Sequence, residues 1–84
     1  MIYIVNYDLQ SPSRDYKSLY TAISAYRHSR IAKSCLLITS SKSSVQIRDD
    51  LGSHMDQNDV LFVCDIRSWA GYNLNPDAVE HLTR

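Results

Sequence analysis

The stretch that decides the fold is Ile2-Tyr3-Ile4-Val5-Asn6-Tyr7-Asp8, at the start of the chain. Its β-branched and aromatic residues predict a strand, and the turn-forming stretch Gln10-Ser11-Pro12-Ser13 follows closely. A second apolar run, Val60-Leu61-Phe62-Val63-Cys64-Asp65-Ile66, predicts the last strand of the domain. These two strands frame segments of helical and extended character, so the sequence predicts a mixed α and β domain.

Two amphipathic helices are predicted between those strands. The first has apolar residues at helical spacing, namely Tyr16, Leu19, Tyr20, Ile23 and Tyr26. The second spans about residues 44–55, with Ser43 or Ser44 as its cap. Its stripe at i, i+4 and i+8 consists of Ile47, Leu51 and Met55.

The segment between the helices predicts a strand pair. Residues 29–32 form a short strand, Lys33-Ser34 a tight turn and residues 35–39 a longer strand. The resulting order βαββαβ is that of an α+β, ferredoxin-like fold, in which an antiparallel four-stranded sheet carries two helices on one face. The first strand then lies between the third and the fourth. We expect a single domain over residues 1–84, with an irregular tail from about 68–84 that ends in a helical turn from Asn75 to Leu82.

The apolar strands predict a homodimer. Along the last strand Val60, Phe62 and Cys64 point to one face, whereas Leu61 and Val63 point to the other. A sheet that is apolar on both faces must be covered on both, and two helices cover only one. A chain of 84 residues with two cysteines has no disulfide framework to stabilise it instead. We therefore expect a dimer through the sheet, which Leu61→Lys or Val63→Lys should dissociate if their face is the interface.

The charges divide the chain into two halves. The formal net charge is zero, but residues 1–48 hold seven basic against two acidic side chains, and residues 49–84 hold two basic against seven acidic, giving +5 and −5. This asymmetry predicts either a basic face that meets nucleic-acid phosphate or complementary halves that pair within a dimer.

Composition also bounds the location of the protein and the kinds of site it holds. No leader and no apolar run of about 20 residues is found, so we expect a cytoplasmic protein with no membrane contact. The cysteines lie in apolar strands and predict core roles. The three histidines show no zinc-ligand spacing with one another or with cysteine.

Asp8 is the main candidate for chemistry, as a catalytic and metal-binding residue. It ends the central strand and should lie near the starts of the neighbouring strands, where Ser34, Cys35 and Asp59 are found. Two carboxylates with a hydroxyl suit Mg²⁺ or Mn²⁺, which retain waters for phosphate chemistry. The alternatives are a turn cap for Asp8 and a turn residue for Asp59.

Basic residues flank the same predicted rim. Arg30 and Lys33 lie beside it, and Arg14 lies near the start of the first helix. Together they predict a surface that binds nucleic-acid phosphate, although each charge alone also fits a solvated face.

Two short motifs resemble a known family. Tyr7-Asp8-Leu9, at the end of the first strand, and Arg30-Ile31-Ala32-Lys33-Ser34-Cys35-Leu36 are similar to the small CRISPR-associated spacer-acquisition subunit and to its SinR-like and virulence-associated protein D relatives. The Asn58-Asp59 pair before the last strand fits the same pattern. The resemblance covers about residues 1–68. It implies a ferredoxin-like homodimer in which the two copies of Asp8 share a divalent ion.

The resemblance leaves two functions open. The first is a metal-dependent endonuclease that acts on RNA or DNA. The second is a non-catalytic dimeric scaffold, or a protein-interaction module of a defence or toxin-antitoxin locus. Ala32 stands where the family has Gln, and the net charge is neutral rather than basic.

Overall fold

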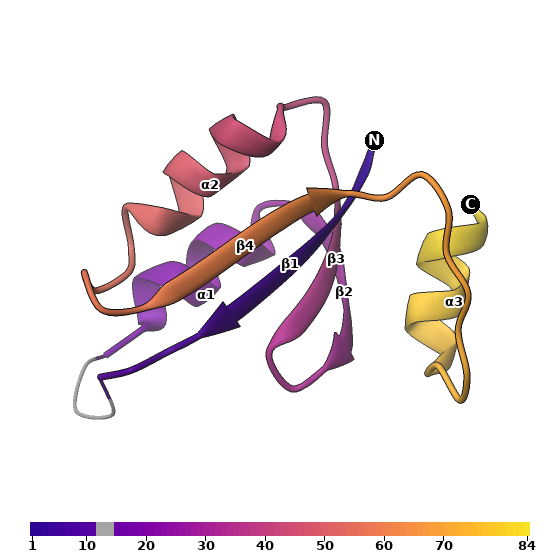
Figure 1. Cartoon of the computed structure of the whole chain (residues 1–84), viewed down its shortest axis with the longest axis horizontal. Coiled ribbons are helices and arrows are strands. Elements are labelled where there is room, and N and C mark those ends of the chain that lie inside the picture. Colours follow the sequence, from indigo (N-terminus) through magenta and orange to yellow (C-terminus); the bar gives the residue numbers. More distant parts are fainter. Residues whose placement is uncertain (12–14) are drawn as a thin grey trace.

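The computed structural model describes residues 1–11 and 15–84 (Figure 1). Within these residues the elements follow the predicted order, and the helical turn expected near the end forms a third helix. They are β1 (Ile2–Asp8), α1 (Lys17–Ser24), β2 (Arg27–Ala32), β3 (Cys35–Thr39), α2 (Ser44–Gly52), β4 (Val60–Asp65) and α3 (Pro76–Thr83).

The four strands form one antiparallel sheet in the order β2-β3-β1-β4. The first strand is central: Ile4 pairs with Leu37 of β3 on one side and with Cys64 of β4 on the other. The prediction that β1 lies between the third and fourth strands, antiparallel to both, is therefore confirmed. The α+β class of the fold is confirmed with it.

The first face of the sheet packs against α1 and α2. Its core joins Tyr3, Val5, Tyr7, Leu36 and Ile38 of the sheet to Leu19, Ile23, Ile47 and Leu51 of the helices. Burying one such aliphatic side chain stabilises the fold by about 1.5–3 kcal/mol relative to leaving it exposed. The predicted apolar stripes of the two helices thus pack in or against the core, except for Tyr20, which is 47% exposed.

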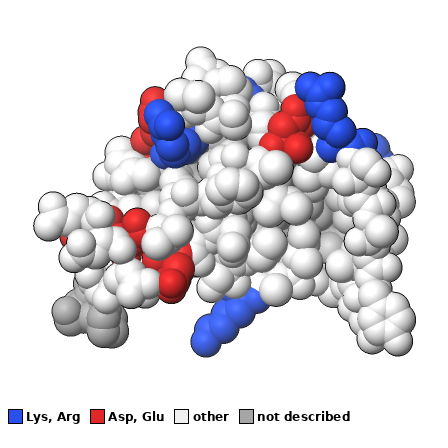
Figure 2. All heavy atoms as spheres, in the orientation of Figure 1, with Lys and Arg blue, Asp and Glu red and all other residues white. Residues whose placement is uncertain are grey.

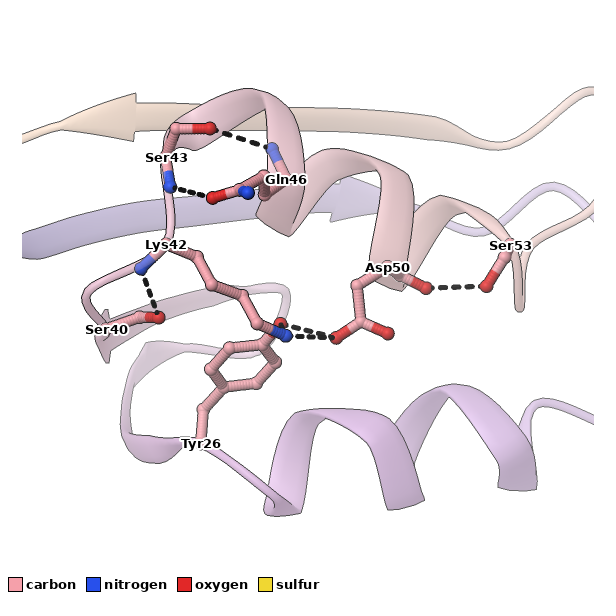
Figure 3. A network of polar contacts seen from close by, with 7 residues as sticks. All are labelled: Tyr26, Ser40, Lys42, Ser43, Gln46, Asp50 and Ser53. Carbon is pink, nitrogen blue, oxygen red and sulfur yellow. Dashed lines mark hydrogen bonds and ion pairs between the residues drawn. The ribbon is translucent and has the colours of Figure 1, made fainter.

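α2 begins with a capping box (Figure 3). Ser43 Oγ accepts from the backbone N–H of Gln46 at 3.1 Å, and the Gln46 side chain accepts from the backbone N–H of Ser43 at 2.8 Å. These bonds satisfy donors that every helix start leaves free. The predicted cap at Ser43 is confirmed, whereas α1 begins after Tyr16 without a side-chain cap.

The second face of the sheet is covered in part by α3. This helix packs on the opposite side of β2 and β3 from α1 and α2 (Figure 1). Leu37 and Ala78 are fully buried there. Residues 68–75 are irregular as expected, while the helical turn expected from Asn75 to Leu82 is confirmed and extends to the eight-residue α3. Asn75 caps it and Pro76 fits its first turn, which explains why the helix forms.

Over β1 and β4, none of the helices in the described residues packs closely against the second face. We call this surface the open face; it is formed by Ile2, Ile4, Asn6, Asp8, Val60, Phe62 and Cys64. Val60 is 54% exposed and Phe62 58% exposed, although both are large and apolar. Leu61 and Val63 pack instead against the core under α1 and α2. The expectation that lysine at these two positions would test a sheet-faced dimer is therefore wrong, since they face the helices.

Candidate functional site

Asp8 lies at the end of β1, at a shallow hollow on the rim of the sheet. Val60 faces it across the β1–β4 pair, and the neighbouring Tyr7 donates its backbone N–H to the Ser34 carbonyl at 3.0 Å. Lys33 and Ser34, from the β2–β3 turn, line the same hollow. The predicted proximity of Asp8 to the starts of the neighbouring strands is confirmed.

The Asp8 carboxylate is exposed and has most of its acceptor capacity directed to solvent. Its Oδ2 accepts from Gln10 Nε2 at 2.7 Å. A carboxylate accepts about four hydrogen bonds or binds a cation through either oxygen. Because Asp8 belongs to the open face, it lies at one end of the same surface as Phe62.

Asp59 has a different role from Asp8, because it holds a loop together. Its Oδ1 accepts from the Gln10 backbone N–H at 2.6 Å and from the Tyr16 hydroxyl at 2.9 Å, while Oδ2 accepts from the Asp56 N–H at 2.8 Å. Burial, together with the bond to Asp59, raises the pKa of Tyr16. Asp59 therefore connects three chain segments, and Gln10 links it to Asp8.

Arg30 is exposed, and one nitrogen of its guanidinium is engaged at the β2–β3 turn. Its Nη1 donates to the Tyr7 hydroxyl at 2.9 Å and to the Lys33 carbonyl at 2.5 Å. The exposed Lys33 is thus the basic side chain nearest to Asp8 among the predicted phosphate-binding residues that the structure describes. Arg14, the third of them, lies outside the described residues.

The charges on the face drawn in Figure 2 are mixed. Lys and Arg lie beside Asp and Glu at several separate places rather than in one basic area. Oppositely charged side chains are also paired on the surface, as in Arg48–Asp49 at 2.9 Å and Arg84–Glu80 at 3.4 Å. The charge asymmetry along the sequence therefore does not divide this face of the molecule into basic and acidic halves.

One protomer by itself offers few ligands for a metal. Over residues 1–11 and 15–84, no group of three or more His, Cys, Asp or Glu side chains could hold an ion together. The Asp8 carboxylate suits a hard cation by its oxygen chemistry, but it needs further ligands from water, substrate or a second chain.

The cysteines only partly fit the roles expected of them. Burial raises the pKa of the half-buried Cys35 thiol, in keeping with a core role. Cys64 is exposed on the open face, so the expectation of a buried core role is wrong for this residue. The reason is the strand alternation, which directs Cys64 away from the helices.

Two polar networks were not predicted from the sequence. The first joins Tyr26, Lys42 and Asp50 (Figure 3). Tyr26 donates its hydroxyl to Asp50, Lys42 Nζ donates to the Tyr26 hydroxyl at 3.2 Å, and Lys42 lies 3.8 Å from Asp50. Burial and the bond to Asp50 raise the pKa of Tyr26. This network fastens the end of α1 to α2.

The second network surrounds His81 of α3, a buried side chain only 3% exposed. Its Nδ1 lies 2.7 Å from Ser29 Oγ and its Nε2 lies 2.6 Å from Thr39 Oγ1. These partners are 52 and 42 residues away in the sequence, so no local spacing reveals them.

Comparison with known proteins adds no assignment to this geometry. Within the described residues, no helix combines the length and the apolar content needed to cross a bilayer. No family model, no curated protein and no solved structure matches the chain.

Proposed function

We propose that the chain works as a homodimer of ferredoxin-like protomers that pack through their open faces. Support comes from the exposure of Val60 and Phe62 on a strand whose other side is part of the core. A second copy would remove these side chains from water, at about 25 cal/mol for each Å² of apolar surface buried. It would also complete the cover that α3 begins.

The activity we propose for this dimer is divalent-metal-dependent cleavage of RNA or DNA. The observation that carries the proposal is that Asp8 belongs to the open face. Twofold packing of this face, with the axis near its Asp8 end, would bring the two copies of Asp8 toward one another. Two carboxylates repel unless a cation lies between them, and such a pair is a site for Mg²⁺ or Mn²⁺.

Each residue of the rim has a role in this proposal. Asp8 would hold the ion, which polarises a phosphoryl oxygen or activates water when it is bound. Gln10 orients the Asp8 carboxylate through its 2.7 Å hydrogen bond. Lys33, on the same hollow, would attract the phosphate, and Ser34 and Asp59 would support the rim from the adjoining loops.

The sequence resemblance supports the same proposal. Tyr7-Asp8-Leu9 lies at the end of β1, and residues 30–36 form the β2–β3 hairpin turn. In the small spacer-acquisition subunit family that these motifs resemble, the matching aspartate is the metal-binding position. Asp8 is the residue of this chain to which that role would pass.

The second candidate function is a non-catalytic scaffold, or a protein-interaction module of a defence or toxin-antitoxin locus, with the same dimer. Two observations favour it. The guanidinium of Arg30 is engaged by Tyr7 and Lys33, and Asp59 is engaged by its loop. On the described part of the rim, each protomer then presents Asp8, which accepts from Gln10, as its exposed acid.

A cleavage assay separates the two functions. Labelled single- and double-stranded RNA and DNA are incubated with the wild type and with Asp8→Asn, in Mg²⁺, Mn²⁺ or chelator. Asp49→Asn is the matched control, because Asp49 is an exposed acid on α2, away from the open face. Cleavage by the wild type and by Asp49→Asn, lost in Asp8→Asn and in chelator, supports the nuclease. Equal traces from all three proteins would leave the scaffold.

A further inference from the structure

α3 is attached to the sheet at a small number of points. At its start, Asn75 Oδ1 accepts from the Ala78 N–H at 2.9 Å, and Asn75 Nδ2 donates to the Arg30 carbonyl at 2.6 Å. The segment that leads to it from β4 is mostly exposed, with Trp69 at 46% and Tyr72 at 89%. A helix of eight residues has little stability of its own, so its position depends on what it contacts.

The main polar attachment of α3 is His81. Its two ring nitrogens lie within hydrogen-bond distance of the hydroxyls of Ser29 on β2 and Thr39 on β3. A neutral imidazole has one donor and one acceptor, and a hydroxyl can serve as the partner of either. The neutral ring is therefore fully satisfied, and it joins the helix to two strands at once.

The surroundings of His81 disfavour a positive charge. Burial lowers the pKa of His81, and the nearby Arg27 and His28 of β2 lower it further. Arg30 of β2 lines the same hollow, as do Asp77 and Glu80 of α3, and β3 contributes the neutral Thr39. The hydrogen bonds of the ring within the described residues go to hydroxyls and not to a carboxylate.

We infer that α3 is a pH-released cover of the sheet, held in place while His81 is neutral and released when His81 takes up a proton. Release would expose the buried Leu37 and join the β2–β3 half of the second face to the open face. This inference does not require the proposed nuclease activity or the dimer, because the contact lies within one chain.

The direction of the pH effect follows from linkage. In the docked state His81 binds a proton less readily than in the released state, where its pKa returns to about 6.5. Docking is therefore at full strength above that value and weakens as the pH falls through it. Each pH unit below it raises the opening constant by up to about tenfold, until the lowered pKa of the docked state is reached.

Amide hydrogen exchange followed by NMR tests the inference. Protection factors, which correct for the intrinsic pH dependence of exchange, are compared at about pH 7.5 and about pH 5.5. We expect the amides of α3 to lose up to about tenfold in protection in the wild type, while the amides of β1 and β3 change little. His81→Gln keeps a donor and an acceptor without a charge, so its α3 protection should not depend on pH.

The control is His54→Gln, which removes a titratable ring beside α1 and α2, on the other face of the sheet from α3. It should keep the pH dependence of the wild type. If His81→Gln fails to fold, the ring titration of His81 in the wild type decides the question: it should lie below the ordinary value and coincide with the loss of α3 protection. Unchanged α3 protection at low pH, equal loss over the whole sheet, or loss of the effect in His54→Gln would overturn the inference.

Discussion

Asp8 and Val60 face one another across the pair formed by β1 and β4. An exposed carboxylate thus adjoins an exposed valine on a surface that continues to Phe62. An exposed apolar surface and an exposed carboxylate therefore lie side by side. A substitution can alter either one without altering the other or the core.

The open face is tested by Phe62→Lys. Phe62 is 58% exposed in the protomer, so lysine there should leave the protomer folded but introduce a charge into an interface formed by this face. The mass measured by light scattering at micromolar concentration should then fall from that of the dimer to the 9.6 kDa of the monomer. Val45→Lys, on α2 and 52% exposed, is the matched control and should remain dimeric. A wild-type mass of one chain would refute the dimer outright.

Asp59 and Asp8 should differ in what they contribute to stability. Asp59→Asn disturbs three hydrogen bonds that join separate segments, so we expect a loss of about 1–3 kcal/mol in the free energy of unfolding. Asp8→Asn should change it by less than about 0.5 kcal/mol, since Asp8 is exposed and bonded to Gln10 alone within the described residues. Urea unfolding at one protein concentration measures both, and equal losses would contradict the assignment of a loop role to Asp59.

Lys33 should carry more of any nucleic-acid binding than Arg30. Lys33→Ala removes one exposed cation, so the slope of log affinity against log salt should fall by about one. Arg30→Ala should mainly lower stability, because Arg30 bonds Tyr7 and the Lys33 carbonyl. Lys42→Ala, in the network with Tyr26, is the control for charge removed elsewhere. An unchanged slope in Lys33→Ala would make the rim an ordinary solvated surface.

The capping box gives a test of local stability. Ser43→Ala should lower the free energy of unfolding by about 0.5–2 kcal/mol, because the N–H of Gln46 then loses its side-chain acceptor. Ser41→Ala, two residues earlier and exposed, should have almost no effect. Thermal unfolding of the two variants compares them directly, and equal shifts in Tm would show that the cap does not stabilise α2.

Much of the fold could be predicted from the sequence because its apolar residues follow clear periods. The runs 2–8 and 60–66 are rich in β-branched and aromatic residues, as strands are, and the stripe through Leu19 and Ile23 repeats at helical spacing. The order of the elements then predicts one antiparallel sheet with β1 at its centre. What the pattern could not decide was which side of β4 the helices cover, since Leu61 and Phe62 are about equally apolar.

The site was predictable only as far as strand register reaches. Antiparallel pairing brings Asp8 to Ser34 and Lys33, and that neighbourhood was expected. The bonds that engage Asp59 come from a loop whose path depends on tertiary packing. The two hydrogen bonds of the His81 ring were missed for the same reason, because their hydroxyl partners come from strands distant in the sequence.

The burial of β3 has a consequence for how the β2–β3 hairpin keeps its strand register. Leu36, Leu37 and Ile38 are all fully buried, so sliding the strand by one residue would exchange one set of aliphatic side chains for another at small hydrophobic cost. Alternation therefore gives this strand little protection against slippage. The register is set instead by the shift in pairing between Arg30 and Ala32 and by the hydrogen bond from Arg30 to the Lys33 carbonyl. The β2–β3 turn thus determines the register of β3, and a single residue inserted there would move every residue that follows it in β3 to the opposite face of the sheet.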